Sequence, residues 1–291
     1  MHFFYFNINY NEGEYMYNNP YLYNQIPFNY NGTIKKGMIR GQESNGMICA
    51  LYEIGIDKKY LSEEDKNGIH ILPNDAKPGD DPIKYLGLDD EVIDFELTAN
   101  RGDLLSILGM AQEIGAIYDK KVKDIDLSYN ENSENINDSF KVNINTENCY
   151  LFLAKKVENV TIKESPDFIK NRLIASDIRP INNVVDISNY VMLECGQPLH
   201  FYDSDRLKGC LEVRQAGKDE KLTTLDNSER TLDENDIVIS DGERAIGLAG
   251  VMGGLDTEVE DTTKNVIIEA AIFNSVRVRK TSKKNIKKWS K

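Results

Sequence analysis

The pattern of apolar and polar residues divides the chain into segments with different periods. Residues 1–32 are rich in Tyr and Asn and keep no steady period of 2 or 3.6, so no helix or strand is predicted there. From residue 33 to residue 93, short apolar runs such as Ile69–Leu72 alternate with turn-rich stretches such as Pro78–Asp81. This second segment is predicted to form a small β-rich unit.

A helix is predicted to begin near Asp103, within the segment of residues 94–146. Apolar residues recur there at steps of three and four along one helical face: Leu104, Ile107, Leu108, Ala111, Ile114 and Tyr118. The polar run Ser128–Asp138 lacks the apolar residues that packing requires. It is therefore predicted to be a linker that marks a boundary between two domains.

The second half of the chain shows an α+β pattern. A first helix is expected at residues 165–176, because Ser165 and Pro166 have the signature of an N-cap and a first turn. A second helix is expected at residues 183–194, which Gly196 ends. Strands are expected at Leu211–Arg214, Lys221–Leu225, Ile237–Ser240, Ala245–Val251 and Val266–Ile272. These elements together predict a mixed sheet with helices packed against it.

Composition and charge restrict the class of protein further. With 291 residues, 40% hydrophobic and 29% charged, the chain has the size of about two domains and the composition of a globular protein. No window approaches 18 uninterrupted apolar residues, so no membrane span is predicted. The net charge of -13 argues against a surface that wraps nucleic acid on all sides. The acid-free run Arg277–Lys291 is basic, and a solvated tail is its simplest interpretation.

The cysteines and histidines are too few and too scattered to predict a metal site. The 4 cysteines form no CxxC pair and the chain has 3 histidines, so neither structural zinc nor a disulfide framework is expected. Isolated thiols of this kind fit a reducing cytosol.

Two polar residues on the second predicted helix are candidate site residues. The helix is strongly apolar, yet Asp186 and Asn189 are three residues apart and share one face. Such side chains most often reach solvent or cap neighbouring backbone groups. The alternative is that they line a pocket and bind a ligand.

His200 is the one candidate for proton transfer in this half of the chain, because the other histidines are His2 and His70. It lies in the stretch Gly196–Asp203, which is interpreted as a turn, and it has apolar neighbours, so a satisfied core histidine is the commoner interpretation. Cys195 lies nearby, but no third group that would orient a Cys/His pair is evident.

Two later features could also approach a ligand. Gly250–Gly254 follows a predicted strand, and its glycines would allow close contact with the backbone, although a tight turn explains it equally well. Glu269 interrupts an apolar strand. Its carboxylate points either to solvent or into a cavity that holds a defined partner.

These motifs, taken in order, resemble the bacterial phenylalanyl-tRNA synthetase β chain. Its editing region resembles Arg179–Pro180, Val184–Asp186, Ser188–Glu194, Gly196–His200, Leu248–Gly254 and Glu269–Ala271. Leu97–Asp103 also resembles this family, and Arg40–Ile48 resembles the later strands of its tRNA-binding OB-like domain. The similarity covers about residues 33–282.

The resemblance implies an α+β fold with a mixed-sheet editing domain and packed helices, preceded by a partial β-rich OB-like domain. The OB-like tRNA-binding domain would occupy residues 33–93, a helix and linker 94–146, and a C-terminally truncated editing domain 147–282. Residues 1–32 would be an atypical segment and residues 283–291 a basic tail.

The family edits because tyrosine differs from phenylalanine by one hydroxyl, which an apolar pocket rejects by only about 100-fold. A second site therefore hydrolyses tyrosine that has been esterified to the phenylalanine tRNA. The resemblance assigns catalytic roles to His200, Glu269 and Asn189, with Glu269 reading the phenol hydroxyl. It assigns substrate binding to Gly253, Ser188 and Gly250, and it implies no metal in this site.

The resemblance also implies partners and a location. They are the phenylalanine tRNA and the synthetase α chain, which forms a heterotetramer with the β chain in the family. Aminoacylation, with its ATP and Mg, belongs to the complete synthetase, so no cofactor is expected in this chain. The expected location is the cytoplasm, with no membrane partner.

The sequence departs from the family pattern at both ends. Met1–Gly32 replaces the first strands of the tRNA-binding domain, and Lys283–Lys291 replaces a helix that closes the tyrosine pocket, so one pocket wall is expected to be missing. The leading hypothesis is an editing hydrolase region within the synthetase. The alternatives are a non-catalytic fragment that binds tRNA or the α subunit, and an inactive remnant of a disrupted gene.

Overall fold

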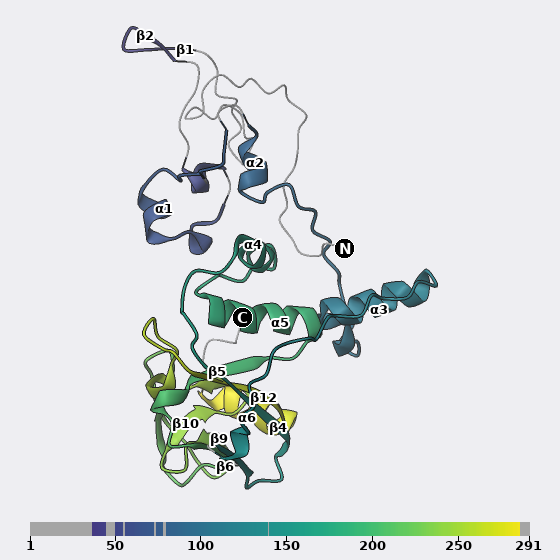
Figure 1. Ribbon diagram of the computed structural model, residues 1–291, viewed down its shortest axis with the longest axis vertical. Coiled ribbons are helices and arrows are strands. Elements are labelled where there is room, and N and C mark those ends of the chain that lie inside the picture. Colours follow the sequence, from purple (N-terminus) through teal and green to yellow (C-terminus); the bar gives the residue numbers. More distant parts are fainter. Residues whose placement is uncertain are drawn as a thin grey trace. The chain divides into compact units, whose positions relative to one another are not determined.

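A computed structural model of the chain describes residues 37–44, 50–54, 56–72, 74–77, 80–138 and 140–285. These residues form two compact units (Figure 1). The first unit combines residues up to 96 with residues 167–180, and the second combines residues 97–166 with residues 181–285. The chain therefore leaves the second unit once, at residues 167–180, and returns to it.

The first unit is built mainly from short helical turns. Strands β1 (Gly37–Ile39) and β2 (Gln42–Ser44) pair as an antiparallel hairpin. The helical elements are η1 (Leu51–Ile54), η2 (Lys58–Tyr60), α1 (Glu63–Asn67), α2 (Pro82–Tyr85) and α4 (Asp167–Ala175). Ser62 and Asp81 cap α1 and α2 by accepting hydrogen bonds from backbone N–H groups.

The structure differs from the sequence-based prediction at Ile69–Leu72, which was expected to be a strand. These residues form no regular element, and Ile71 is 82% exposed. The buried cluster nearby consists of Leu51 and Leu61 instead, each brought inward beside a short helical turn. A run of four apolar residues carries too little pattern to separate a strand from a loop. The OB-like assignment of residues 33–93 stays a prediction.

The second unit contains two sheets and a small hairpin. The larger sheet has the strand order β11-β10-β9-β6-β3, and it is mixed because β3 and β6 run parallel. The smaller sheet has the antiparallel order β4-β12-β5, and β7 pairs with β8. The strands are β3 (Lys141–Ile144), β4 (Cys149–Val157), β5 (Leu199–Asp203), β6 (Cys210–Gln215), β7 (Lys221–Thr223), β8 (Glu229–Thr231), β9 (Ile237–Ser240), β10 (Ala245–Leu248), β11 (Met252–Gly253) and β12 (Val266–Phe273).

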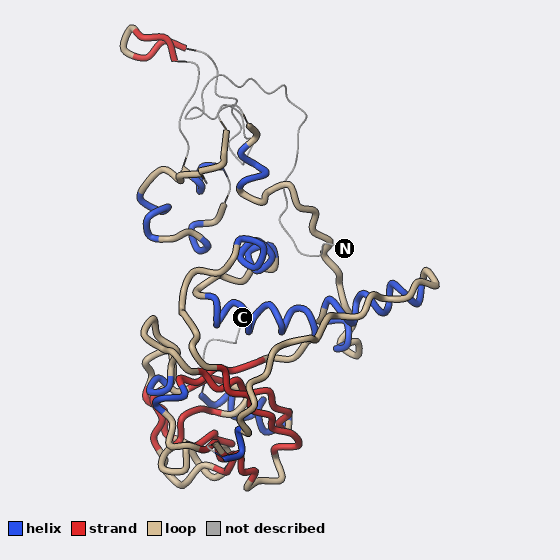
Figure 2. Tube along the Cα trace, in the orientation of Figure 1, coloured by secondary structure: helices blue, strands red, loops and turns tan. Residues whose placement is uncertain are grey.

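Three helices and four short 3-10 turns complete the described part of this unit. They are α3 (Ile107–Ile117), α5 (Asn183–Cys195) and α6 (Ser275–Asn285), with 3-10 turns η3 (Gly102–Leu105), η4 (Ile136–Asp138), η5 (Ser204–Arg206) and η6 (Leu255–Thr257). Asn182 caps α5 by accepting bonds from two backbone N–H groups, and Gly196 ends it in a left-handed conformation with φ 81°. In Figure 2 the strands gather at one end of this unit and α3 and α5 lie beyond them. The predicted α+β class with a mixed sheet is confirmed.

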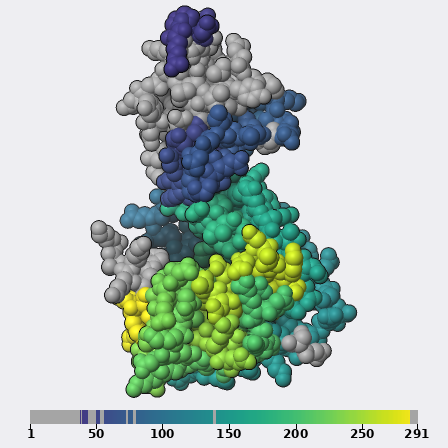
Figure 3. Space-filling model, turned by 90° about the vertical axis from the view of Figure 1, so that its left-hand side faces the viewer, coloured from purple at the N-terminus to yellow at the C-terminus, as the bar shows by residue number. Residues whose placement is uncertain are grey.

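The main core lies between the two sheets. Phe152, Tyr202 and Ile267 come from the three-stranded sheet, and residues such as Val213 and Ile239 meet them from the five-stranded sheet. In the space-filling view, the surface of this part of the chain, coloured green to yellow, is closely packed (Figure 3). None of the helices in the described ranges combines the length and the apolar character that crossing a membrane requires.

Candidate functional site

A cavity of about 250 Å³ opens between the two sheets of the second unit. Its lining residues come from β5, β9, β10, β11, β12 and the connections next to them. They are Pro198, Leu199, His200, Tyr202, Ile239, Gly247, Leu248, Ala249, Gly250, Val251, Met252, Gly253, Glu269, Ala271 and Phe273. The volume is slightly below the roughly 300–1,000 Å³ of common small-molecule sites, so the cavity suits a single side chain better than a nucleotide.

Strand register brings Glu269 and His200 to the same place. Glu269 on β12 lies directly opposite His200 on β5. Directly opposed residues of neighbouring strands project from the same face of a sheet, so both side chains point into the cavity. Of the two interpretations of Glu269, the structure therefore supports a side chain that points into a cavity.

Tyr202 completes a cluster of three polar side chains on this face. It lies two residues after His200 on β5, and side chains at this spacing share a face. Its hydroxyl donates a hydrogen bond to Oε2 of Glu269. Its ring meets the His200 ring edge-on, with centroids 4.5 Å apart and planes at 83°. The phenol therefore contacts both the acid and the imidazole in the cavity.

Burial shifts the pKa of each member of this cluster. Burial raises the pKa of Glu269 to about 7, against the smaller opposing effect of the hydrogen bond from Tyr202. Burial lowers the pKa of His200 to about 4. Burial and the charge of Glu269 raise the pKa of the Tyr202 hydroxyl well above its ordinary value. At neutral pH the site therefore holds a neutral imidazole and a carboxyl group close to its midpoint.

Glycines form the wall that faces this cluster. A Cβ added at Gly253 would lie 2.4 Å from Cε1 and 2.6 Å from Nε2 of His200, closer than side chains approach. Gly250 has φ +66°, in the left-handed region that favours glycine. Strand β11 therefore reaches the imidazole only because Gly253 carries no side chain.

The structure brings four of the six predicted site residues together. His200, Glu269, Gly250 and Gly253 all line the cavity. Ser188 and Asn189 lie on α5, and the lining includes no residue of that helix. Their assigned roles in the site stay predictions.

Ser188 and its helix contact the site through the backbone of β5. The Ser188 hydroxyl donates a 2.8 Å hydrogen bond to the carbonyl oxygen of Leu199, next to His200. Asp186 is buried and accepts bonds from Ser165 Oγ at 2.5 Å and from Ile181 N at 2.8 Å. Of the two interpretations of Asp186, capping of neighbouring groups is therefore the one that the structure supports.

Tyr202 is the polar cavity residue that the sequence-based prediction did not include. The sequence indicated its role in one way: Tyr202 follows His200 by two residues, and this spacing places both side chains on one face of a strand. The segment was interpreted as a turn, and that interpretation removed the signal.

Helix α6 directly follows the strand that carries Glu269 and includes Arg277–Asn285, so the solvated-tail interpretation is wrong for this part of the basic run. Val278 lies close to Gly250, because a Cβ added there would approach Val278 Cγ2 to 3.1 Å. The helix is held by a 2.8 Å hydrogen bond from Thr281 Oγ1 to Asp236 and by Lys284, which lies 2.7 Å from the same carboxylate. Residues 286–291 lie outside the described ranges, and the missing pocket wall stays a prediction.

The buried Glu269 is expected to make the folded state less stable as pH rises. Its pKa is about 7 in the folded chain against an ordinary value of 4.5, so its contribution is present below about pH 4.5 and is lost as pH rises through 7. The shift corresponds to about 3 kcal/mol of unfolding free energy. A Glu269→Gln variant should therefore exceed the native chain in stability at pH 8 and match it near pH 4.5.

Urea unfolding of both proteins at pH 4.5, 6 and 8 measures this difference. His200 has the opposite pH dependence, because its pKa is lowered to about 4 and its contribution is lost as pH falls. The pH dependence that His200 contributes cancels in this comparison, because the native chain and the Glu269→Gln variant both retain His200. A native chain and a variant that respond equally to pH would mean that Glu269 titrates normally in the fold.

Comparisons with known proteins agree with the motif-based resemblance. Residues 148–287 match the family model of the B3/4 domain. Phenylalanine–tRNA ligase β subunits from Streptococcus pneumoniae and Streptococcus mutans are 47% and 49% identical over 253 residues, which is 87% of this chain. The chain spans 32% of the length of each of these relatives.

The comparison with solved structures gives a weaker similarity. An N-terminal fragment of the phenylalanyl-tRNA synthetase β subunit from Pyrococcus horikoshii matches with a TM-score of 0.37 and 17% identity, covering 64% of this chain and 58% of the other. The resemblance indicated by the motifs is confirmed by these sequence relatives, which match 87% of the chain.

Proposed function

From the relationship of this chain to the phenylalanine–tRNA ligase β subunits, we propose that it supports phenylalanyl-tRNA synthesis by hydrolytic editing. The reaction is hydrolysis of tyrosine that has been wrongly esterified to the phenylalanine tRNA. The observation that carries this proposal is the pairing of Glu269 with His200 inside one cavity of about 250 Å³. A cavity of this size admits an amino-acid side chain and leaves the tRNA outside.

Glu269 is the proposed reader of the phenol hydroxyl. A buried carboxyl group next to apolar walls discriminates strongly, because a ligand without the hydroxyl leaves the carboxyl oxygen unpaired at a cost of about 1–3 kcal/mol. With a pKa of about 7, a large fraction of Glu269 is an ionised acceptor at neutral pH. Phenylalanine offers this group no partner, so its ester stays intact.

His200 is the proposed group that positions the attacking water. Its pKa of about 4 keeps the imidazole neutral at pH 7, so one ring nitrogen accepts a hydrogen bond from water and the other donates one. An imidazole this weakly basic orients the water more than it removes its proton. Gly253 lets the imidazole keep this position, because a Cβ there would collide with the ring.

The remaining partners follow from the same relationship. We propose that the chain works with the phenylalanine tRNA and a synthetase α chain, in the cytoplasm. The ATP- and Mg-dependent aminoacylation step would belong to the complete synthetase. Ser188 would act on the site by holding the backbone of β5 beside His200, and Asn189 keeps its assigned catalytic role as a proposal.

Deacylation of charged tRNA by the 291-residue chain tests this function. We expect the native chain to release tyrosine from the phenylalanine tRNA faster than it releases phenylalanine. His200→Ala should lower the tyrosine rate by about 100-fold, the loss that misplacement of a reacting group by about 1 Å can cause. His70→Ala is the matched control, because His70 lies in the first unit, where it contacts Asp65.

Other results would favour the other hypotheses. Tight tRNA binding without deacylation would indicate a non-catalytic binding fragment. Equal rates for native chain and His200→Ala, both above background, would remove His200 from the mechanism. The absence of a cooperative thermal transition would indicate an inactive remnant.

A further inference from the structure

Tyr202 gives Glu269 a phenol partner from within the protein. We propose that Tyr202 is a specificity-determining positioning residue: its hydroxyl holds one oxygen of the Glu269 carboxylate and leaves the other oxygen to accept the phenol of a bound tyrosyl group. This inference rests on the proposed function, because it explains how the same carboxylate is prepared to read its substrate.

The position of Tyr202 is fixed by packing. Tyr202 is 1% exposed and belongs to the core cluster between the sheets. The edge-on contact with His200 holds one side of its ring. Its hydroxyl lies between Glu269 on one sheet and Gly247 on the other, where an added Cβ would be 3.7 Å from the phenol oxygen. The hydroxyl is therefore held against the carboxylate by the core itself.

No other side chain in the described part of the chain donates a hydrogen bond to Glu269. The titratable groups that face it are His200 and Tyr202 on β5, and Cys149 on β4, whose thiol senses its charge. The opposite wall, from β9, β10 and β11, presents only apolar residues and glycines. Tyr202 is thus the group that decides how this carboxylate is oriented.

The hydrogen bond also controls when the carboxylate is charged. A donor to an ionised oxygen stabilises the charged form, and the bond from Tyr202 lowers the pKa of Glu269 against the effect of burial. Without it, Glu269 would stay protonated to higher pH and would lose its fixed orientation. Both changes would weaken recognition of a phenol and leave the binding of a plain phenyl ring unaffected.

The test compares binding of L-tyrosinamide and L-phenylalaninamide to the 291-residue chain by calorimetry between pH 6 and 9. The native chain should prefer tyrosinamide, and the preference should grow as pH rises through about 7. Tyr202→Phe keeps the ring and its packing but removes the donor. Its preference at pH 7 should be lower by about tenfold, and its pH midpoint higher by about one unit.

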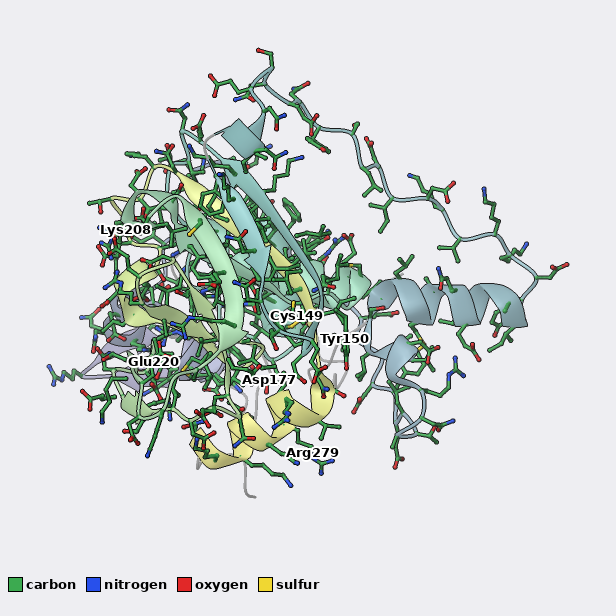
Figure 4. All side chains as sticks on the ribbon, turned by 90° about the horizontal axis from the view of Figure 1, so that it is seen from below. Cys149, Tyr150, Asp177, Lys208, Glu220 and Arg279 are labelled. Atoms are coloured by element: carbon green, nitrogen blue, oxygen red, sulfur yellow. The ribbon has the colours of Figure 1, made fainter. Side chains whose placement is uncertain are left out.

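Two further variants separate positioning from general structural effects. Tyr150→Phe is the matched control, because Tyr150 is 64% exposed at the beginning of β4 (Figure 4) and should leave both readouts unchanged. Replacement of Tyr202 with 3-fluorotyrosine retains a hydroxyl that is more acidic and donates more strongly. It should move the pH midpoint in the opposite direction, to lower pH.

A native preference that survives in Tyr202→Phe with an unshifted midpoint would overturn this inference and leave the proposed function standing. Tighter tyrosinamide binding by Tyr202→Phe would also overturn it, because the hydroxyl would then be a competitor of the ligand. A native chain without any preference for tyrosinamide would refute the proposed function and this inference with it.

Discussion

Glu269→Ala is expected to lower the rate of tyrosine release from the phenylalanine tRNA by about 10- to 100-fold and to leave the slow release of phenylalanine unchanged. The range follows from the roughly 1.5–3 kcal/mol of a hydrogen bond to a charged group, at 1.36 kcal/mol per factor of ten. Glu269 is 7% exposed, so water cannot replace the lost acceptor at low cost. The loss should appear as reduced discrimination between the two esters.

Parallel deacylation assays with both charged tRNAs measure this ratio. Glu147→Ala is a suitable control, because Glu147 is exposed and lies between β3 and β4. If Glu269→Ala slowed both esters equally, the carboxylate would act on the reaction itself and would not read the side chain. If neither rate changed, another group in the cavity would recognise the phenol.

Much of the fold of the second half could be predicted because local signals determine it. Asn182 and Gly196 mark the two ends of α5, and the structure shows each making the cap that its residue type favours. Strand β9 coincides with the expected Ile237–Ser240, a run buried throughout. Such elements depend on neighbours in the sequence, which is why pattern and propensity were sufficient.

The elements that were missed depend on distant partners. Apolar and polar residues do not alternate regularly along β4, because Leu151 and Leu153 on its outer face are exposed. The strand is defined only by its pairing with β12. Only three residues separate β5 from the end of α5, and the residues of β5 were interpreted as part of a turn. Non-local pairing of this kind is set by the whole sheet and leaves little trace in the local sequence.

The candidate site was found from the sequence only in part, and the reason is strand register. Glu269 and His200 are far apart in the sequence, and residue patterns alone left open whether either side chain faced water. Their direct opposition is fixed by the pairing of β12 with β5. A shift by one residue would turn Glu269 away from the cavity, so the site depends on this register. The family resemblance assigned both residues to one site, which hydrophobic periodicity could not do.

The electrostatics of the site conflict with stability, as is typical of functional sites. Glu269 and His200 are both buried, and burial shifts their pKa values toward the neutral forms, to about 7 and about 4. Apolar residues of similar size would avoid both costs. Two buried ionisable groups side by side in a cavity are therefore typical of a recognition site. In a core without a ligand they would only lower the stability of the fold.

Gly253→Ala is expected to abolish most of the deacylation activity while the chain still folds. The added methyl group would lie 2.4 Å from Cε1 of His200 and 3.2 Å from Leu225 Cδ1, so the imidazole must move. A displacement of about 1 Å in a catalytic group can lower a rate by about 100-fold. Overpacking of this kind should also cost about 1–3 kcal/mol of unfolding free energy.

The rate of tyrosine release and the thermal midpoint of the same preparation separate the two effects. Gly102→Ala is the matched control, because a Cβ at Gly102 meets nothing within 4 Å. A Gly253→Ala chain that unfolds at a lower temperature but retains native activity would show that the His200 ring can shift without consequence. His200 would then be a packing residue of the cavity wall, and the water would have to be positioned by another group.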